Sequence, residues 1–96
     1  EILAIQKASK KLKNWRLNDC DIYVTLEPCS MCTGAIIGAR IRKIYIGTMD
    51  LKTGACGSVL NLLEYKFNTN IEIETGIMQQ ECEYILKDFF KKIRKR

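Results

Sequence analysis

Residues 21–47 read DIYVTLEPCSMCTGAIIGARIRKIYIG, and this stretch decides the fold. Its first part, residues 21–27, alternates apolar and polar side chains and is rich in β-branched and aromatic types, which predicts a strand. The small apolar segment 28–39 predicts a helix that Pro28 can open. Residues 43–47 predict a second strand. A strand, a helix and a strand in so short a span make two parallel strands joined by a right-handed crossover, and therefore an α/β fold.

The remaining residues predict the elements that flank this unit. We expect an amphipathic helix over 2–13, a glycine-rich loop over 47–58, a short helix over 59–65, a turn at 68–70, a strand with one wet face over 71–75 and a helix over 79–93. The last helix should turn these side chains toward the core: Cys82, Ile85, Leu86, Phe89 and Ile93. With no repeat or linker, residues 1–96 are expected to form a single domain.

Composition narrows the class of protein. The chain has 96 residues, of which 47% are hydrophobic and 28% charged, as in a soluble globular domain. No apolar run approaches the roughly 20 residues that a membrane span needs, so no membrane partner is expected. The net charge of +5 is concentrated in residues 87–96, whereas residues 1–86 are neutral. A basic arm indicates either a phosphate-rich partner or a solvated last helical turn that complements the helix dipole.

The cysteines indicate a reducing cytoplasm. Five are present, an odd number, and Cys29 and Cys32 are closely spaced. In a reducing compartment such a pair suggests a metal site or a redox centre rather than a structural disulfide. On a helix the two thiols share a face, in a first turn where the dipole and free N–H groups favour thiolate. Zn²⁺ would fit that spacing.

A catalytic zinc ion requires a third protein ligand, and the chain contains no histidine. Cys20, Cys56 and Cys82 are conceivable substitutes, although each is better explained as a small core side chain. The chain also opens on Glu1 within a helical pattern, so we expect an upstream part to be missing.

The sequence resembles the zinc nucleobase deaminases, whose signature is His-x-Glu followed by Pro-Cys-x-x-Cys. Residues 25–58 look most like the bacterial-type tRNA-specific adenosine deaminases of the cytidine/deoxycytidylate deaminase superfamily, and the loop GTMDLKTGACGS over 47–58 carries the assignment to that branch. Glu1-Ile2 matches the end of the family's His-Ala-Glu-Ile motif. The resemblance implies that the histidine ligand precedes Glu1 and that this fragment is inactive without it.

The resemblance also implies the fold and the chemistry. The expected fold is a three-layer α/β/α sandwich with a mixed sheet, here one CMP/dCMP-type deaminase domain that lacks its N-terminal helix and first strands. The expected reaction is hydrolysis of a C–N bond that turns adenosine into inosine at the tRNA wobble position. Hydroxide formed at one Zn²⁺ per subunit, held by Cys29 and Cys32, attacks C6 while Glu1 shuttles the proton. The resemblance further implies a homodimer.

Substrate contacts are expected outside the metal site. In relatives the loop that contains Asp50 and Lys52 lines the RNA entrance, and Phe90 and Arg94 are candidates for base stacking and phosphate binding. Solvated charges remain an alternative for Asp50 and Lys52, and Phe89 is expected in the core.

Three other functions stay open at this point. The first is a deaminase of a free base or nucleotide, such as cytosine or guanine. The second is a thioredoxin-like dithiol oxidoreductase, which shares the strand and the Cys-x-x-Cys helix start. The third is a zinc-bearing RNA-binding module without activity.

Overall fold

The computed structural model describes residues 1–65 and 70–94. The elements follow in the order α1 (Ile2–Leu12), β1 (Asp21–Leu26), α2 (Ser30–Gly38), β2 (Lys43–Thr48), the 3-10 turn η1 (Leu62–Glu64), β3 (Glu72–Glu74) and α3 (Gln79–Arg94). Every predicted helix and strand forms, with shifted ends, and the short helix predicted over 59–65 shrinks to η1. The turn predicted at 68–70 lies largely outside the described residues.

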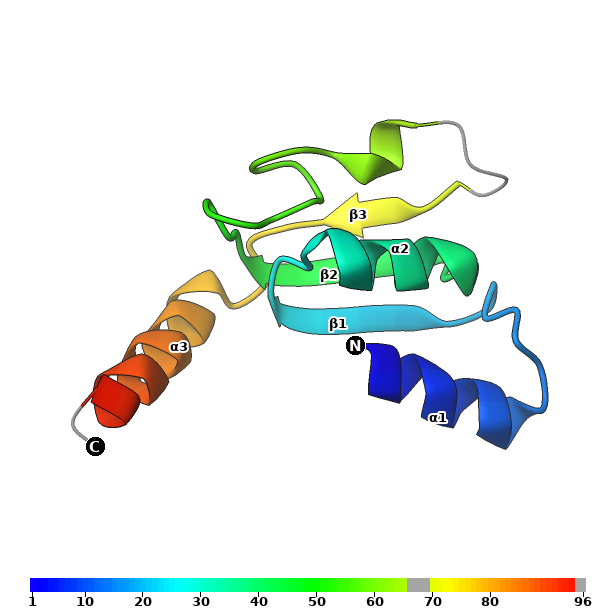
Figure 1. Cartoon of the computed structure of the whole chain (residues 1–96), viewed down its shortest axis with the longest axis horizontal. Helices are drawn as coiled ribbons and strands as arrows, with labels where there is room; N and C mark the ends of the chain where they lie inside the picture. The colour runs from blue at the N-terminus through cyan, green and yellow to red at the C-terminus, as the bar shows by residue number, and fades with distance from the viewer. Residues whose placement is uncertain (66–69, 95–96) are drawn as a thin grey trace.

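The three strands form one sheet in the order β1-β2-β3, and both neighbouring pairs are parallel (Figure 1). Ile22 pairs with Ile44, which pairs with Ile73. The crossover from β1 to β2 through α2 confirms the α/β prediction. Because all strands in the described part of the chain are parallel, the antiparallel strand of the expected mixed sheet stays a prediction.

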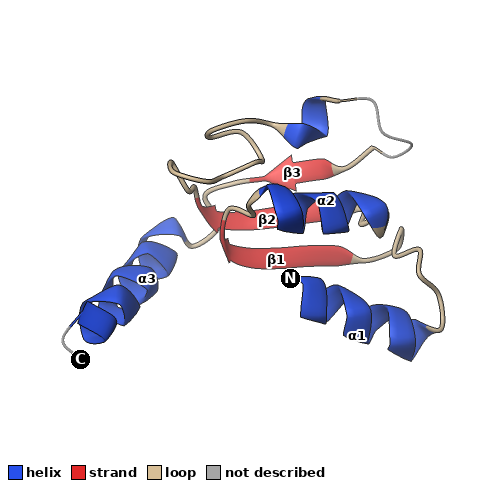
Figure 2. Ribbon diagram, in the orientation of Figure 1, coloured by secondary structure: helices blue, strands red, loops and turns tan. Residues whose placement is uncertain are grey.

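The hydrophobic core lies between the sheet and α2. Helix α2 runs across one face of the sheet, and α1 packs beside α2 along the β1 edge (Figures 1 and 2). Ile44 and Ile46 point from β2 into this layer and are fully buried. The buried cluster consists of Leu17, Ile36, Ala39, Ile41, Ile44, Ile46 and Cys56. A core on one side of the sheet therefore holds α2, and with it the Cys-x-x-Cys segment, in a fixed place.

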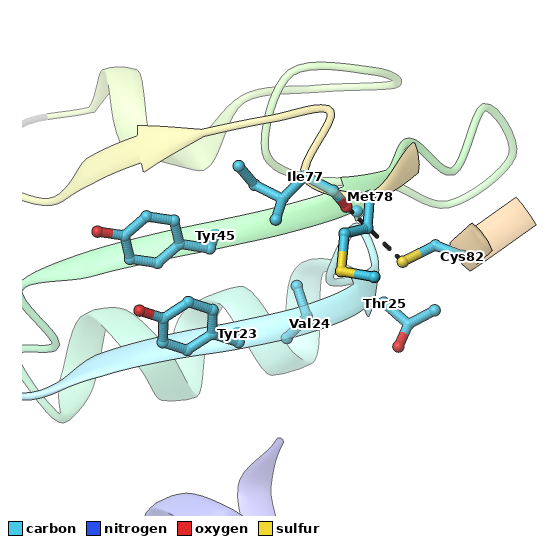
Figure 3. A pocket seen from close by; sticks show the side chains of 8 residues that line it. Tyr23, Val24, Thr25, Tyr45, Ile77, Met78 and Cys82 are labelled. Carbon is cyan, nitrogen blue, oxygen red and sulfur yellow. Dashed lines mark hydrogen bonds between the residues drawn. The ribbon is translucent and has the colours of Figure 1, made fainter. Parts of the chain in front are cut away.

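The opposite face of the sheet is largely open. Tyr23 and Tyr45 stand side by side on it, with ring centroids 4.4 Å apart and planes 4° from parallel (Figure 3). Together with the start of α3 they line a shallow pocket of about 200 Å³. Of the described elements, α3 is the one that contributes to the third layer of the expected sandwich.

The prediction that α3 buries its apolar face is wrong for most of that face. Cys82 and Leu86 are half-buried, but Ile85 and Phe89 are 59% and 55% exposed, and Ile93 is exposed as well. The reason is geometric: α3 contacts the sheet near its first turns and then points away from it (Figure 1). No described element reaches the rest of the helix.

The prediction of one wet face over 71–75 holds only in part: Ile71 is half-buried against the core, whereas Ile73 on the same face is 40% exposed, and Glu72 and Glu74 are exposed. This strand is at the edge of the described sheet, and α2 covers β1 and β2 instead. In residues 1–65 and 70–94 we find no helix with the length and apolar character required to span a bilayer.

Candidate metal and substrate site

The Cys-x-x-Cys helix begins two residues later than the sequence suggests. Helix α2 starts at Ser30, and Cys29 is its N-cap, with extended φ and ψ of −73° and 177°. Pro28 is not the first helical residue because its carbonyl oxygen accepts hydrogen bonds from the Ala55 N–H, at 2.9 Å, and from the Thr33 hydroxyl, at 3.4 Å. Cys29 therefore sits at the mouth of the helix, with Cys32 in the first turn.

The two thiols lie together but differ in acidity. The backbone N–H of Cys32 lowers the pKa of Cys29, and burial opposes this effect only partly. Burial raises the pKa of Cys32 to about 11, and the neighbouring Cys29 sulfur adds to that increase. The expectation of a thiolate at the helix start is therefore confirmed in direction for Cys29 and not for Cys32, whose proton is retained as long as no metal replaces it.

Glu1 lies at the same place, although 28 residues separate it from Cys29 in the sequence. It is the exposed N-cap of α1. Its carboxylate charge acts to raise the pKa of both thiols, so Glu1 lies within electrostatic reach of the pair. The packing of α1 beside α2 thus brings Glu1 into the neighbourhood of the two thiols at the start of α2.

The donor atoms suit zinc in type but not in number. Two sulfurs three residues apart are the pair that tetrahedral zinc sites commonly use. Among the side chains that the structure describes, no group of three His, Cys, Asp or Glu is placed to hold a metal. All five cysteines are free thiols; Cys56 is buried, and Cys20 and Cys82 are half-buried. None of these three joins the pair, in agreement with the expectation that they are core side chains.

The end of β1 carries a buried carboxylate that the sequence reasoning missed. Glu27 is 2% exposed and accepts four hydrogen bonds from the loop after β2. The N–H groups of Asp50, Cys56 and Ser58 donate at 3.0, 2.8 and 3.1 Å, and the Ser58 hydroxyl also donates. Burial opposes ionisation, but these hydrogen bonds outweigh it and leave the pKa of the Glu27 carboxyl below its ordinary value.

Asp50 closes a tight turn in this loop. Its carboxylate accepts from the N–H groups of Lys52 and Thr53, at 3.0 and 3.2 Å, and from the Thr53 hydroxyl at 2.7 Å. The Thr53 hydroxyl, followed by the Lys52 N–H, lowers the pKa of Asp50. Asp50 is thus an ionised turn residue and not a freely solvated charge.

Three of the predicted substrate residues line one groove. Asp50 and Lys52 form one wall and Phe90 of α3 belongs to the other, around a volume of about 470 Å³. The other lining residues are Leu26, Met49, Leu51, Thr53 and Leu86. Phe90 and Phe89 are both exposed and make an edge-to-face contact with centroids 5.6 Å apart. The side chain of Arg94 lies outside the described part of the structure.

The groove and the thiol pair are both connected to the carboxyl end of β1. Leu26, the last residue of β1, lines the groove, and Glu27-Pro28 lead directly from it to Cys29. Both therefore lie at the carboxyl edge of the parallel strands, where α/β proteins form their sites.

Comparisons with known proteins agree with this arrangement. Residues 1–94 match the family of MafB19-like deaminases. The chain is 43% identical over 97 residues to the tRNA-specific adenosine deaminase of Bacillus subtilis (strain 168), covering 100% of this chain and 60% of that protein. It is 43% identical over 95 residues to the enzyme of the same name from Haemophilus influenzae, covering 98% of this chain and 55% of that protein.

A solved structure from work on A-to-I editing by tRNA:A34 deaminases at the wobble position of transfer RNA superimposes with a TM-score of 0.80. It is 37% identical in sequence, and the match covers 88% of this chain and 62% of that one. The chain thus spans 55–62% of the length of these relatives. On its fold, its cysteine pair and the match over residues 1–94, the chain belongs to the MafB19-like deaminase family.

Proposed function

We propose that this chain supplies two metal ligands, the proton-transfer carboxylate and part of the substrate groove of a zinc-dependent deaminase that converts adenosine to inosine in tRNA. One observation carries the proposal: the packing of α1 beside α2 leaves Glu1 near enough to Cys29 and Cys32 for its charge to act on both thiols. A carboxylate beside a metal-binding thiol pair is the arrangement that hydrolytic nucleobase deamination requires.

Cys29 and Cys32 would hold the zinc ion through their sulfurs. When bound, zinc lowers the pKa of a water molecule toward neutrality and so supplies hydroxide for the attack. The N–H groups at the start of α2 favour the ionised sulfur of Cys29, so the chain prepares one ligand before the metal arrives. Cys32 must release its proton on binding, which makes metal affinity increase with pH.

Glu1 is the proposed proton carrier. Its carboxylate would take a proton from the attacking water and deliver it to N1 of the adenine ring, and would then take the proton of the new C6 hydroxyl and pass it to the departing amine as the C–N bond breaks. Water and adenosine are consumed, and inosine and ammonia are released. Glu1 is suited to this task because it is exposed at the end of α1 and therefore reachable by substrate, while its charge still acts on the Cys32 thiol.

The groove supports an RNA substrate. Lys52 places a cation at its wall, and Phe90 offers an exposed ring on which an unpaired base can stack. The basic residues 87–96, which include Arg94, would meet the phosphates of an anticodon stem-loop. The similarity to tRNA-specific adenosine deaminases and to a structure from work on wobble-position editing supports adenosine in tRNA as the substrate and the wobble position as the target.

Further properties of the whole protein belong to the same proposal. We place residues 1–96 in one deaminase domain, and the five free cysteines favour a reducing, cytoplasmic compartment. A second copy is the proposed protein partner, because α1 and α2 expose the apolar side chains of Leu3, Leu12 and Met31. Light scattering of the full-length protein at two concentrations tests for the homodimer.

The decisive experiment compares substrates with the full-length gene product. Purified zinc-loaded protein is incubated with an anticodon stem-loop that carries adenosine at the wobble position, with the same RNA carrying adenosine elsewhere, and with free adenosine, cytosine and guanine. We expect inosine only in the first RNA, and about one zinc per subunit by elemental analysis. Turnover of the free compounds alone would replace the RNA assignment with a free-base deaminase. A metal-free protein with reversible dithiol oxidation would replace it with a redox function.

A further inference from the structure

The loop over residues 50–58 folds around one buried carboxylate. All four donors to Glu27 come from this loop, at its start (Asp50) and at its end (Cys56 and Ser58). None of the ion pairs found in the described chain involves Glu27. A buried carboxylate that is balanced by three backbone N–H groups and one hydroxyl, with no cation, is costly to bury unless those donors stay in place. The hydrogen bonds therefore fix the loop at both ends.

The loop passes so close to the Glu27 carboxylate that position 54 must be glycine. A β-carbon at position 54 would overlap the Glu27 carboxylate, so the loop can pass over Glu27 only with glycine there. The Gly54 N–H is in turn bonded to the Asp50 carbonyl at 2.9 Å, which closes the turn between the two ends. Glu27, Asp50 and Gly54 thus form one interlocked unit.

The same loop has a second, outward side. Asp50, Lys52 and Thr53 belong to the groove wall, while the Asp50 N–H points inward to Glu27. Through Asp50, the inner hydrogen bonds therefore set the position of the outer wall. On the other side of Glu27, only Pro28 separates it from Cys29. Pro28 itself is bonded to the loop through the Ala55 N–H.

We infer that Glu27 is a positioning residue for the reaction: its carboxylate fixes the substrate loop 50–58 at a set place relative to the Cys29–Cys32 pair. This inference rests on the proposed function, because it gives the groove wall the task of holding RNA. Glu27 touches neither the groove nor the thiols in the described structure, so it acts through Asp50 and the loop backbone.

The inference separates substrate binding from the chemical step. If Glu27 acts on the loop, its loss affects how well RNA is held, while zinc and the Glu1 carboxylate stay in place. Glu27→Gln keeps the size of the side chain but turns an NH₂ group toward backbone N–H donors, so at least one hydrogen bond is lost and two donors oppose each other. Ser58→Ala is milder, since it removes one hydroxyl donor and leaves the backbone bonds.

The test uses the full-length, zinc-loaded protein with the anticodon stem-loop as substrate. For Glu27→Gln we expect KM to rise by roughly tenfold or more, kcat to change by less than about threefold, and zinc per subunit to stay at the wild-type value. Ser58→Ala should raise KM by a smaller factor. Glu72→Gln, at an exposed position on β3, is the matched control and should leave all three values unchanged.

Hydrogen–deuterium exchange gives a second readout that needs no activity. In Glu27→Gln the peptide that covers residues 49–60 should exchange about tenfold faster than in wild type, while peptides of β2 keep their rate. If the wild-type protein is inactive but the Glu27→Gln variant still exchanges faster, the proposed function is wrong. The conclusion that Glu27 fixes the loop would then still stand. An active wild type whose Glu27→Gln variant keeps its KM and its exchange rate overturns the inference. Loss of zinc in that variant would overturn it as well, since Glu27 would then serve the metal site. Should Glu27→Gln not fold, an unchanged KM and exchange rate in Ser58→Ala overturn it.

Discussion

Gly54 lies directly against the Glu27 carboxylate, so closely that a β-carbon at position 54 would overlap Oε1 of Glu27. The backbone at Gly54 does not have a positive φ, so conformational freedom is not the reason for glycine. The reason is space, since the loop must come this close for the N–H groups on either side of Gly54 to reach the carboxylate.

Gly54→Ala should therefore destabilise the protein, although alanine is normally the safer residue. The added methyl group must displace either the loop or the Glu27 side chain, and overpacking of this kind costs about 1–3 kcal/mol in the free energy of unfolding. Chemical denaturation followed by circular dichroism measures this loss. Gly34→Ala is the control: position 34 lies within α2 with nothing within 4 Å of the new β-carbon. That variant should be neutral or more stable by up to ~1 kcal/mol.

A second close contact anchors α3. A β-carbon at Gly47 in β2 would overlap the Cys82 sulfur and come within 2.8 Å of the Thr25 carbonyl oxygen. Cys82 also donates to the Ile77 carbonyl oxygen at 3.8 Å, as the dashed line in Figure 3 marks. We expect Gly47→Ala to cost about 1–3 kcal/mol and to loosen α3.

Cys82→Ala should recover part of that loss when it is combined with Gly47→Ala, because it removes the sulfur and leaves the contact with Thr25. The double-mutant cycle measures a favourable coupling energy between positions 47 and 82. Strictly additive losses would show that α3 is not held at this point.

The exposed ion pair between Asp21 and Arg42 predicts a pH effect. Arg42 donates through Nε and Nη2 to the two carboxylate oxygens, at 2.9 and 3.1 Å, and lowers the pKa of Asp21 from its ordinary value of 3.8. A lowered folded-state pKa stabilises the fold above pH 3.8, and the contribution is lost as the pH falls through the folded-state pKa.

Asp21→Asn should therefore lower the denaturation midpoint slightly at pH 7 and hardly at all at pH 2. The difference at pH 7 should shrink in 1 M salt, because the pair is exposed to solvent. A gap between variant and wild type that is equal at both pH values would mean that the ion pair contributes nothing.

The unequal thiols predict selective alkylation of the metal-free protein. Cys29 has the lowered pKa, whereas burial raises the pKa of Cys32 and of Cys56. Because thiolate is the reactive form, iodoacetamide at pH 7.5 should label Cys29 first after zinc is removed with a chelator. Peptide mass spectrometry at several times gives the order. The alkylation rate of Cys32 should reach that of Cys29 only as the pH approaches 11. Equal rates for the two thiols at pH 7.5 would contradict the conclusion that Cys29 is the more acidic one.

The successes and failures of the sequence predictions have physical causes. The strand–helix–strand unit was predictable because residues 21–47 combine a strand period, a proline and a run of small apolar side chains. The thiol pair was predictable from its spacing, and Glu1 from the family motif. In contrast, the amphipathic pattern of α3 indicates a face that some element can cover, and it does not say which element does so. Ile85 and Phe89 are exposed for that reason.

Glu27 could not be predicted because three of its four donors are backbone N–H groups, and all four lie 23 to 31 residues away. Backbone donors have no residue type and leave no signature in the sequence. The predicted start of the helix at Pro28 was wrong for a related reason, because the Pro28 carbonyl oxygen accepts a hydrogen bond from the Ala55 N–H, which is distant in the sequence. The one available signal was a carboxylate between a buried strand and a proline, followed along the chain by a loop with three glycines.

The different roles proposed for Glu1 and Cys29 give the last prediction. Glu1→Gln in the full-length protein removes the proposed proton carrier and keeps the shape of the side chain, so kcat on the stem-loop should fall by about 10²-fold or more with zinc content unchanged. Cys29→Ser should instead lose both zinc and activity, since a hydroxyl is a poor substitute for thiolate. Glu81→Gln, in the first turn of α3, is the matched control with unchanged kcat and zinc. Glu1 would leave the mechanism if its variant turned over at the wild-type rate, and it would become a metal ligand if that variant lost zinc. Because the Glu1 charge acts on the Cys32 thiol, these two outcomes are the ones that separate a proton carrier from a ligand.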